Sequence, residues 1–523
     1  MLEGGNNLMS KLKLPKPNPI IFSVFITGAC VLIVEIVAVR VLSPHYGNTI
    51  FTFSSVITVI LSALSIGYYF GGKLADLRPS PKWFYGIILI SGIALLGFHF
   101  LSILALPILS FVLPLTSGPL ISSLLLFLFP ALLLGTLSPY AIKLETIHLK
   151  EQGIGNISGK IFFWSTLGSI TGSLLSGFFL IPRFGINNIF IGTSVVLVIL
   201  GSVPLLLTNF KKFRLIFLLS IFVLIFFATN YSTSETKTKA VYSKDGVYEK
   251  IEIYDDFQAG RPTRFFKQDK SSSAAMFLDS NDPKDLVYDY SKYYSIYKII
   301  KPDIKNTLII GGGAYSIPKT LLAESPDIYV DVAEIEPSLF ELSKKYFNLK
   351  ENPRLKNYIQ DGRRLLKDSD KQYDLIFSDV YYSLFSVPAH FTTQEFFKLA
   401  KQKLSRDGFF IANFIGDLSD SSPSLTMSEI KTFKSVFQNS YFFAVRSTEE
   451  TKSQNIIFVG IKNNQPIDFE SNSITQNSNP FLRSLKNKEI EIGKLDLSPH
   501  LILTDNFSPV EYLTSQVLKR KIN

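Results

Sequence analysis

The chain has 523 residues, of which 47% are hydrophobic, a formal net charge of +10 at pH 7 and a single cysteine. So large an apolar fraction excludes an ordinary soluble globular protein, and one cysteine excludes an intrachain disulfide framework. The basic residues are scattered in short clusters beside apolar runs, which favours membrane-topology signals over a nucleic-acid surface, and the five histidines show no metal-ligand spacing. We therefore expect a membrane protein with no metal and no nucleic-acid partner.

Apolar runs crowd the first part of the chain, and a helix needs about 20 apolar residues to cross a bilayer. About seven stretches reach that length, at residues 20–42, 50–71, 84–106, 119–141, 160–181, 187–208 and 213–230. The run from 84 to 115 is too long for one span and too short for two, so we expect a span followed by a re-entrant or interfacial piece. These stretches therefore predict a multi-pass protein of the cell membrane.

Two features of these spans stand out. Small residues recur between Ser165 and Gly177, which favours close helix packing over a transport path. Glu35 is an ionisable group inside the first span, where charge is expensive. A functional role and an ion pair with Arg40 both remain open.

Lysine and arginine gather before the first span and in the even-numbered loops, which places the N-terminus and those loops in the cytoplasm. With seven spans, the polar C-terminal part of the chain would then lie outside. A nucleotide-type cofactor is found inside, so these two inferences conflict, and an eighth or re-entrant segment would reconcile them.

The C-terminal part begins with alternating stretches and turn signals, which predict a small β-hairpin domain over about 240–280. A helix is expected at 284–300. Next, "NTLIIGGG" predicts a strand that runs into Gly311, Gly312 and Gly313, and "IYVDVAEIEP" predicts a second strand that ends at Glu334. A glycine turn followed about twenty residues later by an acid is typical of a site that holds a nucleoside ribose.

Two more acids follow predicted strands: Asp361-Gly362 after a third strand and Asp379 after a fourth. Strands that alternate with helices imply a parallel, doubly wound sheet whose ligands lie beyond the carboxyl ends of the strands. Each acid taken singly is explained by a turn, but the glycines and the three acids together favour one site.

The order of these motifs resembles the polyamine aminopropyltransferase family, spermidine synthase-like, and in particular its membrane-fused branch. The resemblance covers about 240–450, and "SPHYGNTIFTFSSVITVILSALSIGYYFGGKLADLRPSP" resembles the membrane part of the fused proteins. It implies an α/β doubly wound domain of the class I methyltransferase type, preceded by a polytopic helical membrane domain and a small N-terminal β-hairpin subdomain.

The resemblance also implies roles. Gly311, Gly312, Gly313 and Gly362 would surround the donor, which is decarboxylated S-adenosylmethionine or S-adenosylmethionine. Glu334 would hold its ribose, Asp361 its adenine amino group, and Asp379 would be the base that takes a proton from the attacking amine.

The acceptor half departs from the family pattern. The family has an aspartate where this chain has Ala314 and another where it has Tyr382, and the family's glutamine after the hairpin tyrosine is Glu249 here. The family's tyrosine-histidine-glutamate stretch is matched loosely by Tyr288-Asp289-Tyr290. We therefore expect a rewritten acceptor site whose candidate residues are Glu249, Tyr288, Asp289, Tyr381 and Tyr382.

Further expectations concern the edges of this site. Glu336 is a candidate replacement charge, and Tyr315 is a candidate for an aromatic cage with Tyr381 and Tyr382. The stretch "HFTTQEFF" predicts a helix cap at Thr392 or Thr393, with a lid carrying His390 as the alternative. In "LTDNFSPVEYL", Asp505 and Glu511 would close the site or belong to a docked terminal segment.

The expected organisation is a tail, a membrane domain, a β subdomain, a nucleotide-binding domain and an extension, at 1–18, 19–231, 240–283, 284–460 and 461–523. The expected reaction is transfer of an aminopropyl or related group to a small-molecule amine or another acceptor, by an enzyme seated in a lipid bilayer. Alternatives are a methyltransferase acting on a membrane-delivered substrate, and a polyamine transporter or sensor with a non-catalytic ligand-binding domain. Whether the chain forms a homo-oligomer is left open.

Overall fold

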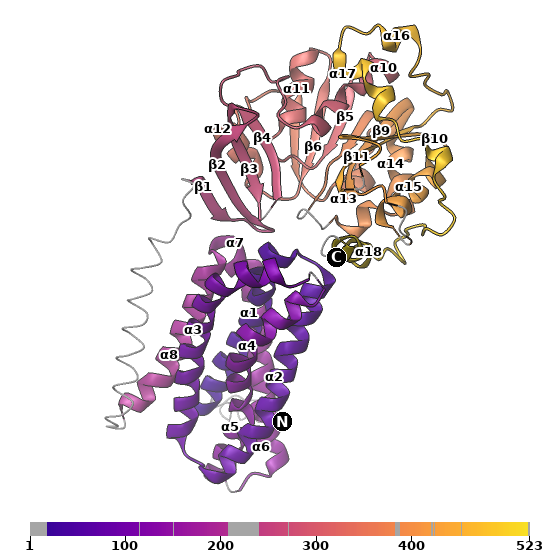
Figure 1. Cartoon of the computed structure of the whole chain (residues 1–523). Coiled ribbons are helices and arrows are strands. Elements are labelled where there is room, and N and C mark those ends of the chain that lie inside the picture. The colour runs from indigo at the N-terminus through magenta and orange to yellow at the C-terminus, as the bar shows by residue number, and fades with distance from the viewer. Residues whose placement is uncertain are drawn as a thin grey trace, which may run out of the picture. The chain divides into compact units, whose positions relative to one another are not determined.

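The computed structural model describes residues 18–114, 116–149, 151–207, 240–269, 271–381, 387–419, 422, 424–450 and 452–520. Contacts divide the chain into two compact units, one formed by Met1–Tyr46 with Phe51–Glu235 and the other by Gly47–Ile50 with Thr236–Asn523. The first unit is helical and the second contains both sheets of the protein (Figure 1).

The helical unit is built from long apolar helices. They are α1 (Pro19–Tyr46), α2 (Ile50–Leu77), α3 (Pro81–Val112), α4 (Gly118–Gly135), α5 (Leu137–His148), α6 (Ile154–Leu175), the π-helical turn η2 (Ser176–Leu180), α7 (Ile181–Arg183) and α8 (Ile186–Leu206). Six spans among the described residues are long and apolar enough to cross a membrane. They coincide with the first six predicted stretches, and the seventh, 213–230, lies outside the described residues.

One expectation for this unit was wrong. The described part of this stretch up to Val112 contains no break into a span and a re-entrant piece, because α3 continues as one helix of 32 residues with Pro107 inside it. Helices tolerate an internal proline in a membrane unit when neighbouring groups satisfy the freed backbone. The helix ends at Leu113, whose N–H bonds to the carbonyl of Leu109.

The small residues predicted to mediate packing lie where α1 and α6 cross. A Cβ on Gly168 would lie 2.0 Å from the carbonyl oxygen of Phe25, and one on Gly172 would lie 2.3 Å from that of Ala29. The hydroxyl of Ser169 donates to the carbonyl of Gly28 at 3.1 Å. Close backbone approach, which only glycine permits here, therefore holds this helix pair together.

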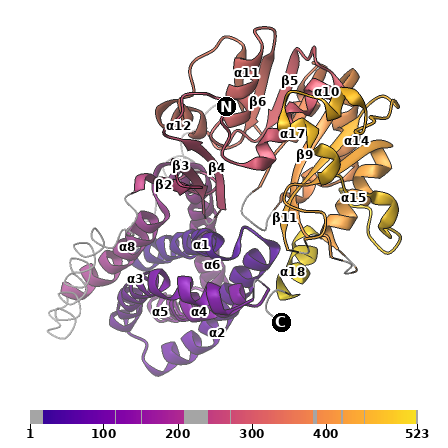
Figure 2. The same ribbon diagram turned by 45° about the horizontal axis from the view of Figure 1, so that its top comes forward.

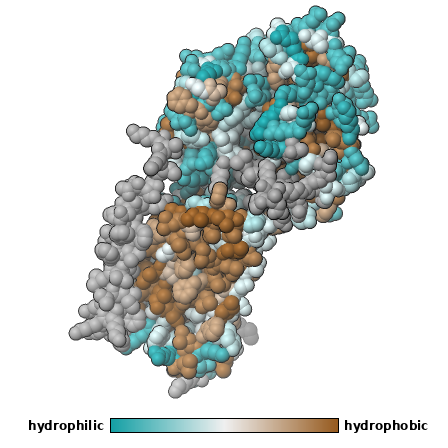
Figure 3. Space-filling view, in the orientation of Figure 1, coloured by the Kyte–Doolittle hydropathy of each residue, from teal (hydrophilic) through white to brown (hydrophobic). Residues whose placement is uncertain are grey.

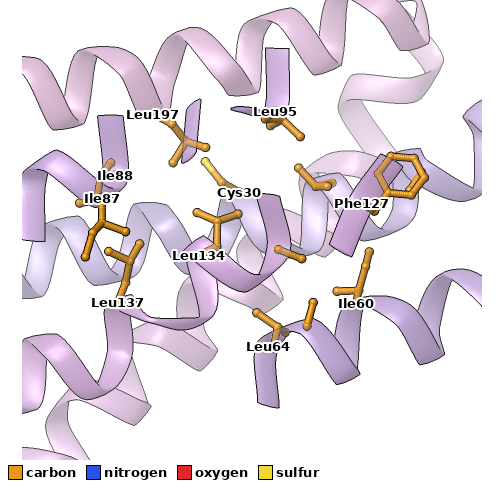
Figure 4. Close-up of a cluster of buried hydrophobic side chains, with 14 of the residues drawn as sticks. Cys30, Ile60, Leu64, Ile87, Ile88, Leu95, Phe127, Leu134, Leu137 and Leu197 are labelled. Atoms are coloured by element: carbon orange, nitrogen blue, oxygen red, sulfur yellow. The ribbon is translucent and has the colours of Figure 1, made fainter. Parts of the chain in front are cut away.

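The interior of the helical unit is apolar and includes the single cysteine. Cys30 is 3% exposed and lies among side chains from α2, α3, α4 and α8 (Figure 4). The outer surface of the helices is also strongly hydrophobic (Figure 3), and Phe111 and Phe178 are 91% and 80% exposed. A helical unit that is apolar both inside and outside is typical of a bundle surrounded by lipid. Glu35 is half-buried on α1, and its role stays a prediction.

The second unit begins with a four-stranded antiparallel sheet in the order β1-β2-β3-β4. Its strands are β1 (Ala240–Asp245), β2 (Lys250–Gln258), β3 (Arg261–Gln268) and β4 (Ser271–Phe277). The predicted hairpin is therefore part of a larger meander, because β1 and β4 extend it on both sides.

The large sheet has seven strands in the order β10-β11-β9-β8-β5-β6-β7. They are β5 (Asn306–Ile310), β6 (Tyr329–Glu334), β7 (Leu355–Ile359), β8 (Tyr373–Ser378), β9 (Leu404–Gly416), β10 (Asn439–Ala444) and β11 (Gln454–Ile461). The pairs from β7 to β9 are parallel, as predicted, but β11 runs antiparallel to both β9 and β10. A direct connection from β10 to β11 is short, and short connections join antiparallel strands.

Helices cover both faces of this sheet (Figures 1 and 2). They are η3 (Asp289–Ile296), α10 (Tyr297–Ile300), α11 (Ser316–Glu324), α12 (Leu339–Tyr346), α13 (Gly362–Asp368), η4 (Ala389–Phe391), α14 (Gln394–Lys403), α15 (Leu425–Val436), α16 (Asn472–Thr475), α17 (Pro480–Arg483), η5 (Leu485–Lys488), η6 (Ile492–Lys494) and α18 (Val510–Arg520). Along β5, Ile309 joins the core under α11, whereas Leu308 and Ile310 join the core under α14 and α15. The predicted α/β doubly wound fold is confirmed.

Candidate functional site

The glycine turn after β5 requires glycine for two reasons. Gly311 and Gly313 have φ angles of 94° and 50°, which side chains other than glycine rarely adopt. In addition, a Cβ on Gly311 would lie 2.2 Å from the carbonyl oxygen of Asp379. The backbone of the turn is therefore exposed to a ligand on one side and packed against the end of β8 on the other.

Tyr315 follows this turn and does not join an aromatic cage. It has a φ angle of 56°, is fully buried, and donates its hydroxyl to Asn357 Oδ1 at 2.6 Å. Its ring packs edge-on against Phe340. The cage expectation was wrong for this residue because the left-handed backbone turns the side chain into the core.

Glu334 closes β6 and ties the glycine turn in place. Its Oε2 accepts the Gly312 N–H at 2.7 Å, and its Oε1 accepts the Glu336 N–H at 2.8 Å. Burial raises the pKa of Glu334, although the backbone N–H groups act in the opposite direction. Each carboxylate oxygen keeps a second lone pair with which to bind a ligand hydroxyl.

Asp361 caps α13 and connects it to the segment before α14. Its Oδ1 accepts the Arg364 N–H at 2.9 Å, and its Oδ2 lies 3.0 Å from His390 Nε2. Burial alone raises the pKa of Asp361, but these two hydrogen bonds outweigh it and lower the pKa. Asp361 is therefore a charged acceptor at the rim of the site.

The helix cap predicted nearby is confirmed at Thr393, whose hydroxyl oxygen accepts the Phe396 N–H at 3.3 Å. The same hydroxyl donates to Asp505, which also forms a bidentate pair with Arg363 at 2.7 and 2.5 Å. The stretch around Asp505 is therefore a docked terminal segment. It is held by Arg363, the residue that follows Gly362.

Asp379 follows β8 at the centre of the sheet. Its Oδ1 accepts Asn413 Nδ2 at 2.9 Å, and Asn413 Oδ1 accepts Asn455 Nδ2 at 2.9 Å. Burial raises the pKa of Asp379, and the hydrogen bond from Asn413 and the nearby Tyr290 hydroxyl partly lower it. A carboxylate with a raised pKa is a better proton acceptor than an ordinary exposed one.

One cavity of about 270 Å³ brings most of the predicted residues together. Its wall contains Glu249, Tyr288, Gly311, Gly312, Gly313, Glu334, Asp361, Gly362, Asp379 and Tyr381. Glu336, Tyr290, Asn413 and Asn455 also line it.

Two predicted acceptor residues are not among them. Asp289 has a side chain that is 71% exposed and pairs with Lys292 at 2.7 Å, because the tight η3 turn points it away from the cavity. Tyr382 lies outside the described residues.

Asn413 and Asn455 were missed in the sequence. The available signal was an amide inside each of two otherwise apolar strands, "FFIANFIG" and "QNIIFVGI". Polar groups inside a core strand need hydrogen-bond partners, so an amide in such a strand points to a specific contact.

The strand order, with one antiparallel strand and a cavity at the carboxyl ends of β5, β6 and β8, defines a methyltransferase-like fold. Residues 295–471 match the family described as Spermine/spermidine synthase domain. The chain therefore carries a spermidine synthase-like domain.

Individual proteins are similar to parts of this chain. A polyamine aminopropyltransferase of Vibrio vulnificus is 25% identical over 294 residues, which span 55% of this chain and 93% of that protein. Polyamine aminopropyltransferase 1 of Streptomyces coelicolor is 22% identical over 412 residues, or 74% of each chain. A solved structure of a probable spermidine synthase from Corynebacterium glutamicum is 20% identical, with a TM-score of 0.39, and covers 46% of this chain and 86% of that one.

Proposed function

We propose that this chain is a membrane-bound transferase that moves an aminopropyl group from decarboxylated S-adenosylmethionine to an amine, with Asp379 as the base. The family match and the aminopropyltransferase relatives support an enzyme of the transferase class. The apolar helices of the first unit support its placement in the cell membrane.

The charge of the cavity wall favours decarboxylated S-adenosylmethionine over S-adenosylmethionine as the donor. Five carboxylates line the cavity, and among its described lining residues there is no lysine, arginine or histidine. Decarboxylated S-adenosylmethionine carries a sulfonium and an ammonium and no carboxylate, so such a wall attracts it. S-adenosylmethionine has an additional carboxylate, which this wall would repel.

The reaction follows from the position of Asp379. The acceptor amine, once neutral, attacks the carbon beside the sulfonium; the new C–N bond forms as the C–S bond breaks and its electron pair stays on sulfur. The proton released from nitrogen passes to the Asp379 carboxylate, and neutral methylthioadenosine leaves. A well-placed general base contributes about 10²–10⁴-fold to such a step.

The remaining residues bind and orient. The Gly311–Gly313 turn lets the donor approach the backbone, Glu334 accepts from the ribose hydroxyls, and Asp361 accepts from the adenine amino group. Asn413 fixes one oxygen of Asp379, so that the other oxygen is available to the acceptor.

Substitution of Asp379 by asparagine tests the proposal in the purified full-length protein. We expect methylthioadenosine release to fall by about 10²–10⁴-fold while calorimetric binding of methylthioadenosine is retained. Asp370→Asn, on an exposed turn at the other end of β8, is the matched control and should keep the wild-type rate. An unchanged rate in Asp379→Asn would show that Asp379 is not the base.

Donor choice is tested by calorimetry with both donors. Tighter binding of decarboxylated S-adenosylmethionine supports aminopropyl transfer, and tighter binding of S-adenosylmethionine would replace the proposal with methyl transfer. Binding without turnover for any acceptor would favour a sensor.

A further inference from the structure

The strand order divides the cavity into two sides. The glycine turn after β5 lies in the middle, with β6 and β7 on one side and β8, β9 and β11 on the other. Glu334 and Asp361 follow β6 and β7, so they belong to the donor side. We call the other side, which Asp379, Asn413 and Asn455 line from β8, β9 and β11, the acceptor side.

The remaining lining carboxylates also belong to the donor side. Glu336 lies two residues beyond Glu334, and its Oε2 accepts the Tyr248 N–H at 3.2 Å. Glu249 follows Tyr248 in that same turn, and the Gly246 N–H bonds to its carbonyl oxygen at 2.8 Å. Asp379 is thus the one carboxylate that the described residues place in the wall of the acceptor side.

Two buried acids of the described residues, Glu429 and Asp417, come from elements next to this side. Glu429 on α15 acts electrostatically on Tyr381, but it is 1% exposed, is not in the cavity wall, and burial raises its pKa well above the usual value. Asp417 directly follows β9, but it is 5% exposed, accepts from the Ser419 N–H and hydroxyl, and is not in the cavity wall either. Among the described residues, neither acid places a second carboxylate in the wall of the acceptor side.

Tyrosine side chains around Asp379 present rings instead of free hydroxyls. The Tyr288 hydroxyl pairs with Ser272 Oγ at 2.8 Å, and the Tyr290 hydroxyl donates to the carbonyl of Ser273 at 3.2 Å. The Tyr381 hydroxyl accepts the N–H of Ile415. Each of these hydroxyls already has a hydrogen-bond partner, so the three tyrosines supply mainly the contact area of their rings.

Asn455 therefore supplies the remaining polar recognition. One of its N–H groups is bound to Asn413, which leaves a carbonyl oxygen and a second N–H that can face the cavity. An amide of this kind satisfies a hydroxyl or another amide, because each can both donate and accept. It cannot neutralise a second ammonium, whose burial without a counter-charge is expensive, and the face of an aromatic ring offsets only part of that cost.

We propose that the acceptor has a single amino group, which reacts beside Asp379, and a neutral hydrogen-bonding group at its other end that Asn455 recognises. Amino alcohols and amino amides fit this description, and α,ω-diamines do not. The inference rests on the proposed function and specifies its acceptor class.

Three acceptors of equal carbon length test this in the full-length protein: 4-amino-1-butanol, 1,4-diaminobutane and n-butylamine. With decarboxylated S-adenosylmethionine as donor and methylthioadenosine release as the readout, kcat/KM should be about tenfold higher for the amino alcohol than for either of the others.

Variants of Asn455 test the recognising residue. Asn455→Leu should lower kcat/KM for 4-amino-1-butanol about tenfold more than for n-butylamine, so that the two acceptors become equal. Asn455→Asp supplies the missing carboxylate and should reverse the preference toward 1,4-diaminobutane. Thr448→Asp adds the same charge on an exposed turn and should leave the preference unchanged.

Donor binding, measured separately, distinguishes the two levels of inference. A folded protein that does not bind the donor would overturn the proposed function, and this inference with it. A protein that binds the donor but prefers 1,4-diaminobutane, or responds to none of the three amines, would overturn the acceptor class alone.

Discussion

Glu429 offers a sharp test of the electrostatics of the second unit. It lies in the middle of α15 at 1% exposure, and its Oε2 has no hydrogen-bond partner among the described residues. Burial raises its pKa well above the ordinary value, so the folded protein keeps this proton at pH values where the unfolded chain has lost it. We expect Glu429→Gln to change how stability depends on pH.

The sign and the size of the effect follow from proton linkage. Above about pH 4.3, the unfolded glutamate binds no proton while folded Glu429 still binds one, so the free energy of unfolding falls by about 1.4 kcal/mol per pH unit. The stabilisation from this bound proton is fully present at lower pH, and it is lost as the pH rises toward the pKa of Glu429 in the folded protein. Glutamine has no such proton, but its extra buried N–H costs about 1–3 kcal/mol at every pH. Glu429→Gln should therefore be the less stable protein near pH 5, and its disadvantage should shrink or reverse toward pH 7.5.

Pulse proteolysis of the full-length protein in graded urea, from pH 5 to pH 7.5, measures this for the second unit. Glu351→Gln, at a side chain that is 85% exposed, is the matched control and should differ from wild type by the same amount at every pH. Parallel pH profiles for wild type and Glu429→Gln would refute the reasoning, because they would mean that Glu429 ionises in the folded state as it does in the unfolded one.

Two further substitutions test other contacts. Gly168→Val places a side chain against the backbone of Phe25 and should destabilise the helical unit by about 1–3 kcal/mol or more, which lowers its melting temperature in detergent. Gly159→Val on the same helix meets open space and is the control. Equal melting temperatures for the two variants would contradict the crossing of α1 and α6. Asn413→Leu removes a hydrogen bond that lowers the pKa of Asp379, so the acid limb of the kcat/KM profile for methylthioadenosine release should move to higher pH, and an unmoved limb would show that Asn413 does not act on the base.

The large elements of this protein were predictable because each follows from a local pattern. Six apolar runs became six helices, since length and hydropathy alone decide whether a helix can cross a bilayer. The glycine turn and the acids Glu334, Asp361 and Asp379 line one cavity, because parallel strands place their carboxyl ends at one edge of the sheet.

The rest depends on contacts between distant residues. Nothing local to Asn455 indicates that its amide reaches Asn413 on another strand, 42 residues away. Tyr315 has the aromatic ring that a cation cage needs, but its left-handed backbone directs the side chain into the core. Asp289 adjoins a lining tyrosine, yet a 3-10 turn rotates successive side chains too far for both to face the cavity.

Because Cys30 is buried, the full-length protein is suited to labelling at a single introduced cysteine. Because the chain has one thiol and it is 3% exposed within an apolar core, native protein should be almost inert to thiol-reactive dyes without any prior removal of cysteine. A cysteine introduced on an exposed turn, for example in place of Thr448, would then be the single reactive thiol. Labelling it in intact cells with a reagent that cannot cross membranes, before and after permeabilisation, reports directly which compartment supplies the donor and the amine.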